Sequence, residues 1–166
     1  LARAADRIVT IELGAAGNRG MSDPEAVEYL EAAIAELAEL PQVDQGKIAV
    51  AGVCQTGRHP LVLAAERPLA AALVWYGAAS KREWQVSARY PKPLDELIAR
   101  VDCPVLGIFG EADHVISLDD VRRLRDTLDR PARPTPSRSI RARRTAGSTT
   151  PCRAATAKSL PRMPGA

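Results

Sequence analysis

A short apolar run that ends in a glycine-flanked cysteine constrains the fold of this chain more than any other stretch. Residues 48–53 read Ile-Ala-Val-Ala-Gly-Val, which is too short for a buried helix and typical of a strand covered on both faces. Cys54 follows directly, Gly57 stands three residues later, and an apolar helical pattern continues from Leu61. A strand, a thiol between glycines and then a helix predict a nucleophile elbow, a sharp turn that lifts the sulfur clear of the sheet.

The elbow competes with a simpler interpretation of Cys54. A lone cysteine after a strand is usually a small buried hydrophobe without chemistry. The flanking glycines favour the elbow, in which a helix N-terminus favours the thiolate form and the amide of Gln55 is free to hold an oxyanion. Because Thr56 stands where the commonest elbow has glycine, the turn is expected to be looser or slightly rotated.

Strand and helix patterns alternate on both sides of the elbow. Ser22 and Glu25 form a capping box for a helix that stops at Pro41, and Ser117 with Asp120 caps a later one. Further strands are expected at residues 8–13, 69–76 and 104–109, and further helices after the elbow, at 94–101 and up to 128. A long helix between two strands is a crossover, so the sequence predicts an α/β fold with a mostly parallel sheet and ligands at the carboxyl ends of its strands.

Two segments resemble the dienelactone hydrolases, which are α/β-hydrolases that use Cys where most relatives use Ser. Residues 52–58 read Gly-Val-Cys-Gln-Thr-Gly-Arg, and residues 103–114 contain the turn Phe-Gly-Glu-Ala-Asp-His. The resemblance covers about residues 24–129. It implies a partial α/β-hydrolase fold that lacks its first strands and its last, and hydrolysis of a small ester or lactone without metal or cofactor. The chain begins at Leu1, and we expect it to be a fragment.

Asp113 is the acid that the resemblance implies. In α/β-hydrolases the triad order is nucleophile, acid and histidine, and the acid stands on a turn of this kind after a strand. Glu111 is a weaker candidate for the same role. The alternative for Asp113 is a turn residue that bonds only its own backbone.

The third member of the implied triad is harder to place. His114 is adjacent to Asp113, so the two side chains and the thiol cannot readily form one line. His59 lies about a turn along the helix that leads away from the sulfur, and its side chain is expected at the surface. Neither is predicted to be the base. The resemblance instead implies a histidine after one more strand beyond Leu128, where the sequence changes character.

Charge divides the chain into two regions. Residues 1–129 carry all 20 Asp and Glu with 14 Lys and Arg, whereas residues 130–166 carry nine Lys and Arg and no acid. The second region also holds six of the prolines, and such a composition predicts a disordered tail. A basic arm that binds nucleic acid or an anionic surface is one interpretation, and it would make the protein a non-catalytic remnant. A merely solvated charged segment is another.

A shifted reading frame explains more of the tail. If each new codon takes the third base of one residue and the first two of the next, the codon spanning Arg144 and Thr145 reads NAC, which includes a histidine codon. The following codons permit Gly-Trp-Leu-Asn-Asp-Thr-Met, and those from Ile140 permit Tyr-Pro-Gly-Ala. This pattern resembles the family's segment around its triad histidine, so we interpret the tail as an out-of-frame product.

Composition excludes several other classes. One Phe, two Trp and three Tyr are too few for a nucleic-acid stacking platform, and no apolar run is long enough to cross a bilayer. Three cysteines without CxxC spacing predict neither a zinc site nor a disulfide scaffold and fit the reducing cytoplasm. The glycines at 14, 17 and 20 match no nucleotide-binding spacing. In the irregular segment 78–93, Trp84 and Tyr90 either line a substrate pocket or cover the core.

Overall fold

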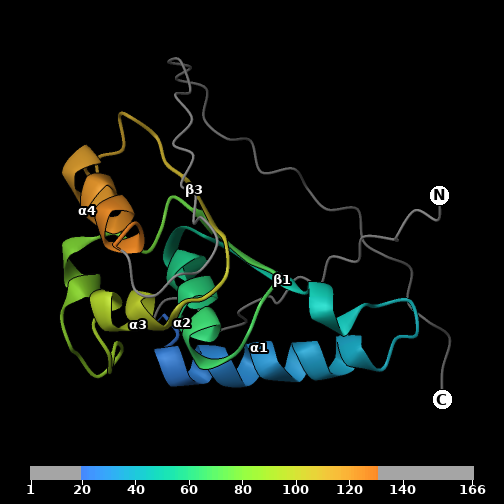
Figure 1. The fold of residues 1–166 in the computed structure, drawn as a ribbon. Coiled ribbons are helices and arrows are strands. Elements are labelled where there is room, and N and C mark those ends of the chain that lie inside the picture. The colour runs from blue at the N-terminus through green and yellow to red at the C-terminus, as the bar shows by residue number, and fades with distance from the viewer. Residues whose placement is uncertain (1–19, 131–166) are drawn as a thin grey trace, which may run out of the picture.

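Three parallel strands and four α-helices alternate along the part of the chain that the computed structural model describes, residues 20–130 (Figure 1). The strands are β1 (Ala49–Val53), β2 (Ala71–Trp75) and β3 (Val105–Ile108), and the α-helices are α1 (Asp23–Ala38), α2 (His59–Glu66), α3 (Leu94–Arg100) and α4 (Leu118–Leu128). Short 3₁₀ helices are η2 (Gln45–Lys47), η3 (Cys54–Arg58) and η4 (Lys81–Trp84). The alternation confirms the predicted α/β class. The strand expected at 8–13 and the tail beyond 130 lie outside the described residues.

The two longest helices begin at the predicted capping boxes. The Ser22 hydroxyl accepts from the amide of Glu25, whose carboxylate accepts from the amide of Ser22 at 2.9 Å. Ser117 and Asp120 make the same reciprocal pair at the start of α4. Each box satisfies two amides that the first turn of a helix leaves without partners, which is why the helices begin at these serines.

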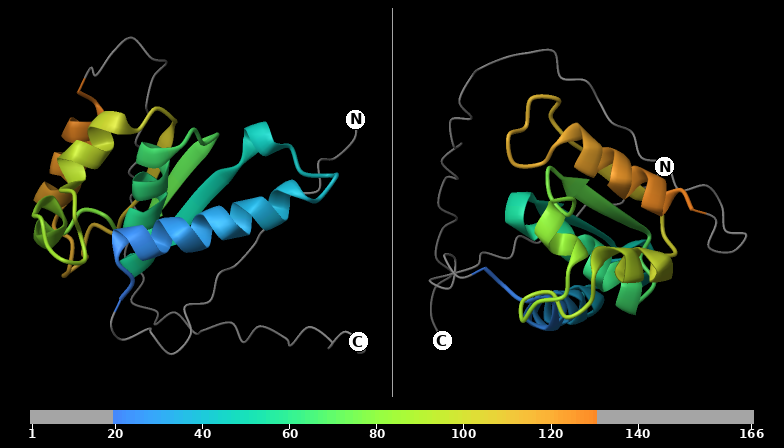
Figure 2. Two further views of the ribbon diagram at one scale, coloured as in Figure 1. Left: turned by 90° about the horizontal axis from the view of Figure 1, so that it is seen from below. Right: turned by 90° about the vertical axis from the view of Figure 1, so that its left-hand side faces the viewer.

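The sheet has the order β1-β2-β3, and both pairings are parallel. Val53 is opposite Trp75, and Trp75 is opposite Ile108, so all three strands end at the same edge (Figure 2). The connections through α2 and α3 are the crossovers that parallel pairing requires. The loops that follow Val53, Trp75 and Ile108 therefore meet at one end of the molecule, as the sequence predicts.

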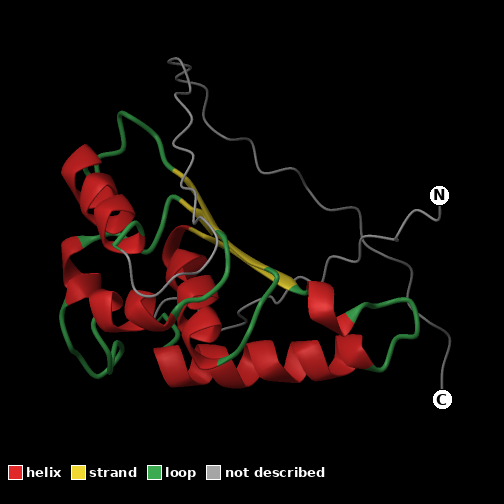
Figure 3. Ribbon diagram, viewed as in Figure 1, coloured by secondary structure: helices red, strands yellow, loops and turns green. Residues whose placement is uncertain are grey.

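The described helices cover only one face of the sheet. In Figure 3 the strands are seen nearly edge-on, and all four α-helices lie on the same side. Alternate residues on the other side are exposed, among them Ala49, Ala51, Val53, Trp75 and Leu106. The expectation that β1 is covered on both faces is thus wrong for residues 20–130. The apolar composition of β1 is compatible with burial on both faces, but it does not determine which segments pack against the strand.

Trp84 and Tyr90 cover the core. Their side chains are only 8% and 6% exposed, and the indole NH of Trp84 donates to the carbonyl of Ala79 at 3.1 Å. The guanidinium of Arg123, from α4, lies 4.0 Å above the Trp84 ring. Of the two interpretations of these loop aromatics, the structure shows core packing.

Candidate active site

Cys54 sits on the sharp turn that the sequence predicts. It is the first residue after β1, it is exposed, and its φ of 54° lies in the left-handed region that non-glycine residues rarely adopt. The turn continues as η3 and passes into α2 at His59, because Pro60 is tolerated only in the first turn of an α-helix. A solvent-accessible thiol on a strained strand-to-helix turn is the geometry of a nucleophile elbow.

Three glycines make this turn sterically possible. A Cβ on Gly52 would overlap the carbonyl of Thr56, and one on Gly77 would overlap the carbonyl of Cys54. A Cβ on Gly57 would lie 2.7 Å from the Cα of Gly77. The elbow and the turn after β2 therefore touch backbone to backbone, and no side chain fits between them.

Thr56 braces the turn from the position that glycine fills in the commonest elbow. Its hydroxyl accepts from the amide of Val53 and donates to the carbonyl of Val53, each at 2.9 Å. The extra bulk of Thr56 is thus accommodated by a 3₁₀ turn that delays the α-helix. The turn thus departs from the commonest elbow as a 3₁₀ segment, which is wound more tightly than an α-helix and is not looser.

Gly77→Ala is expected to lower the free energy of unfolding by about 1–3 kcal/mol, because the new methyl group meets backbone atoms that cannot rotate away. Urea unfolding followed by circular dichroism measures the change. Gly110→Ala is the matched control, since a Cβ at Gly110 meets nothing within 4 Å. We expect the control to change stability by less than about 0.5 kcal/mol. Equal effects of the two substitutions would contradict the tight contact at the elbow.

A second strained turn, which was not expected from the sequence, follows β2. Tyr76 and Ala78 have φ values of 39° and 57°, and they flank Gly77. Trp75 and Tyr76 are 47% and 40% exposed and their rings pack edge to face, with centroids 6.5 Å apart. Two exposed aromatic side chains thus stand at the end of the strand next to the elbow strand.

Asp113 lies at the same end of the sheet. It follows β3 by five residues, and because strands are spaced about 4.8 Å apart, the ends of β1 and β3 are separated by about 10 Å. One carboxylate oxygen, Oδ1, accepts from the amides of Val115 and Ile116 at 2.7 and 3.1 Å. Within residues 20–130, Oδ2 accepts no hydrogen bond. The turn role of Asp113 therefore leaves one oxygen available to orient an imidazole. Glu111 is exposed on the same loop.

The two histidines differ in environment. His114 is exposed, as its place beside Asp113 suggests. His59 is only 7% exposed, so the expectation of a surface position is wrong. The 3₁₀ turn shifts the start of α2 and directs this side chain inward, where burial lowers the pKa of the imidazole and the negative charge of Asp23 partly opposes that effect.

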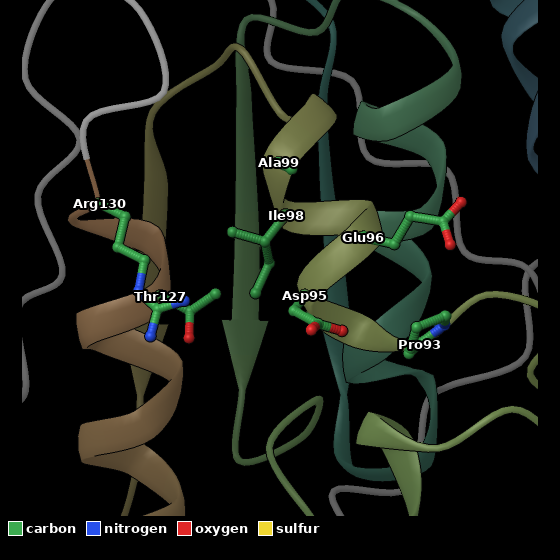
Figure 4. Close-up of a pocket in the computed structure, with 7 residues that line it drawn as sticks. All are labelled: Pro93, Asp95, Glu96, Ile98, Ala99, Thr127 and Arg130. Carbon is green, nitrogen blue, oxygen red and sulfur yellow. The ribbon is translucent and has the colours of Figure 1, made fainter.

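A separate groove of 480 Å³ lies between α3 and α4 (Figure 4). Its lining residues are Pro93, Asp95, Glu96, Ile98, Ala99, Thr127 and Arg130. Neither Cys54 nor Asp113 contributes to it, so this groove is distinct from the elbow. Within the described chain, no cluster of His, Cys, Asp and Glu side chains is arranged to hold a metal ion. None of the helices between residues 20 and 130 has the length and apolar character needed to cross a bilayer.

Part of this chain is similar in sequence to curated proteins of two bacteria. A candidate carboxymethylenebutenolidase of Methylorubrum extorquens AM1 is 30% identical over 105 residues, which make up 63% of this chain and 35% of that protein. An Escherichia coli K12 protein described in the same way is 31% identical over 86 residues, or 51% of this chain and 31% of its own length. The matched segments thus span about one third of these curated relatives.

The described fold is also similar to solved structures. A candidate dienelactone hydrolase from Klebsiella pneumoniae superposes with a TM-score of 0.62 at 29% identity, over 73% of this chain and 48% of that one. A dienelactone hydrolase-like promiscuous phosphotriesterase, P91, shares the fold with a TM-score of 0.54 at 21% identity, over 80% of this chain and 47% of that one. The sequence profile of the dienelactone hydrolase family matches residues 11–134. Because that match covers most of the chain, the protein belongs to the dienelactone hydrolase family.

Proposed function

We propose that this chain is part of a hydrolase of small esters or lactones in which Cys54 is the nucleophile. The observation that supports the proposal most directly is the exposed thiol in a left-handed conformation at the end of a parallel strand. That conformation costs free energy, and the glycine contacts and the Thr56 hydroxyl maintain it. A buried cysteine in a packing role would need none of these features.

In the proposed reaction the Cys54 thiolate attacks the carbonyl carbon of the ester and forms a carbon–sulfur bond. The carbonyl electron pair moves onto oxygen, where the amide of Gln55 donates a hydrogen bond to the oxyanion. Collapse of this intermediate expels the alkoxide, which takes a proton from the imidazolium of the triad. Water then hydrolyses the thioester, with the imidazole as general base. No metal or cofactor enters the scheme.

Asp113 is proposed to hold the histidine through its Oδ2 atom, while Oδ1 keeps the turn in shape. The histidine itself is proposed to be the one encoded in the shifted frame near Arg144, beyond the described residues. The chain as written is therefore expected to be impaired in hydrolysis. We further infer that it works in a reducing compartment such as the cytoplasm, since the thiol must stay reduced.

Alkylation with iodoacetamide at mildly acidic pH, followed by peptide mapping, tests the nucleophile. We expect preferential labelling of Cys54, because its thiol is exposed on the strained turn at the end of β1. Cys103 is 5% exposed and should be shielded. Cys152 lies outside the described residues and serves as the reference for an unactivated thiol. Preferential labelling of Cys152 would remove the basis of the elbow assignment.

The competing hypothesis is a non-catalytic remnant whose basic tail binds nucleic acid or an anionic surface. Titration of the full chain with duplex DNA at low salt, together with turnover of an activated ester by the frame-corrected protein, separates the two. Salt-sensitive DNA binding without turnover would favour the remnant. Turnover that requires Cys54 would favour the hydrolase.

A further inference from the structure

Arg58 is a fully buried charge at the end of the elbow turn, and the proposed reaction leaves it without a role. It is the last residue of η3, the turn that begins with Cys54, and its side chain is 1% exposed. An arginine is almost never buried to this extent unless its charge is paired and its donors are satisfied. The position of Arg58 therefore needs an explanation beyond surface solvation.

The guanidinium of Arg58 joins two other segments of the chain. Its Nε and Nη2 donate to the two carboxylate oxygens of Asp23 at 2.8 and 2.9 Å, which is the bidentate geometry of a strong ion pair. Nη1 donates to the carbonyl of Glu83 at 2.9 Å, and Nη2 donates to the carbonyl of Lys92 at 2.6 Å. The ring of Tyr90 lies 4.4 Å from the guanidinium carbon.

These contacts form a junction between the elbow, the start of α1 and the loop that precedes α3. The loop is also bound directly to α1, since the amide of Asp23 donates to the carbonyl of Arg89 at 3.0 Å. Arg89 in turn donates from its side chain to the carbonyl of Met21 at 3.0 Å. Asp23 is thus itself held by the loop that precedes α3, so its ion pair with Arg58 can hold the end of η3 in place.

The contacts of Arg58 at the end of η3 are relevant to the site because Cys54, at the start of η3, has a strained backbone conformation. Cys54 has a positive φ, and strained conformations persist only where the surroundings determine them from several sides. Thr56 fixes the start of the turn to β1, and Arg58 fixes its end to Asp23. We propose that Arg58 and Asp23 are positioning residues that set the orientation of the Cys54 thiol and of the Gln55 amide. The inference rests on the proposed function of Cys54.

The test replaces the pair in the full-length chain by apolar side chains of similar size, Arg58→Met with Asp23→Leu, because buried ion pairs often tolerate this exchange without loss of stability. The matched control is Arg67→Met with Glu31→Leu, which removes a half-exposed ion pair of 2.6 Å between Arg67, at the end of α2, and α1. The iodoacetamide reaction of Cys54 is followed from about pH 5 to about pH 9. We expect the first variant to react about tenfold more slowly across this pH range, and the control to match the parent protein.

Hydrogen exchange at the amides of residues 55–57 is measured in the same proteins and should be faster in the first variant. An unchanged alkylation profile together with unchanged exchange would show that the pair serves stability alone and would overturn the proposal. If the double variant does not fold, Arg58→Lys, which keeps the charge but loses the fork, is judged by the same two measurements. If parental Cys54 reacts no faster than Cys152, the proposed nucleophile fails, and hydrogen exchange alone decides the positioning role.

Discussion

Inserting one base near the codons for residues 128–138 is expected to raise ester hydrolysis by at least about a thousandfold, because loss of a triad member removes several powers of ten in rate. In the chain as written, the described region offers His59, which is buried, and His114, which is adjacent to Asp113. Neither is proposed as the base. The corrected frame would supply a histidine after a new final strand, where the family order of catalytic groups requires it.

The measurement is turnover of an activated ester by the corrected and the original chain at equal concentration. Cys54→Ala in the corrected chain is the control for background hydrolysis and should return the rate to that of the original. The nucleotide sequence provides an independent check. A codon spanning Arg144 and Thr145 that does not encode histidine in the shifted frame would defeat the frame account, and the tail would have to be treated as a basic arm.

Asp113→Asn in the corrected chain is expected to reduce kcat by about 10⁴-fold while the fold stays intact. The amide oxygen of Asn can still accept from Val115 and Ile116, so the turn should survive the substitution. What is lost is the charge that fixes the imidazole tautomer and stabilises the imidazolium.

Steady-state kinetics and a melting curve measure these two consequences of Asp113→Asn separately. Glu111→Gln is the matched control on the same loop, and we expect it to change kcat only fewfold. A fewfold loss for Asp113→Asn with a large loss for Glu111→Gln would transfer the role to Glu111.

Local signals in the sequence predict much of the described fold. The capping boxes at Ser22 and Ser117 predict where α1 and α4 begin, because a side chain that satisfies free amides acts within four residues. Crossover helices predict a parallel sheet, and parallel strands place Cys54 and Asp113 at one edge. These features depend on short-range chemistry and chain connectivity, both of which are visible in one sequence.

Other features depend on contacts that no local pattern contains. Arg58 is 35 residues from Asp23, so the buried ion pair could not be predicted from periodicity. The local signal is a charged residue directly before α2, two residues ahead of Pro60. The burial of His59 follows from the rotation that the 3₁₀ turn imposes on the helix, and the open face of β1 follows from which neighbours the described chain contains.

The contact between Gly57 and Gly77 has a consequence for how this region responds to substitution. Two loops that touch through their backbones share one space, so a larger residue in either loop displaces the other. The effects of substitutions at the two positions on the free energy of unfolding should therefore be non-additive, since a first substitution already forces the two backbones apart. A larger residue at position 57 or 77 is therefore expected to require a shift of the opposite backbone, and with it a change in the position of the Cys54 turn.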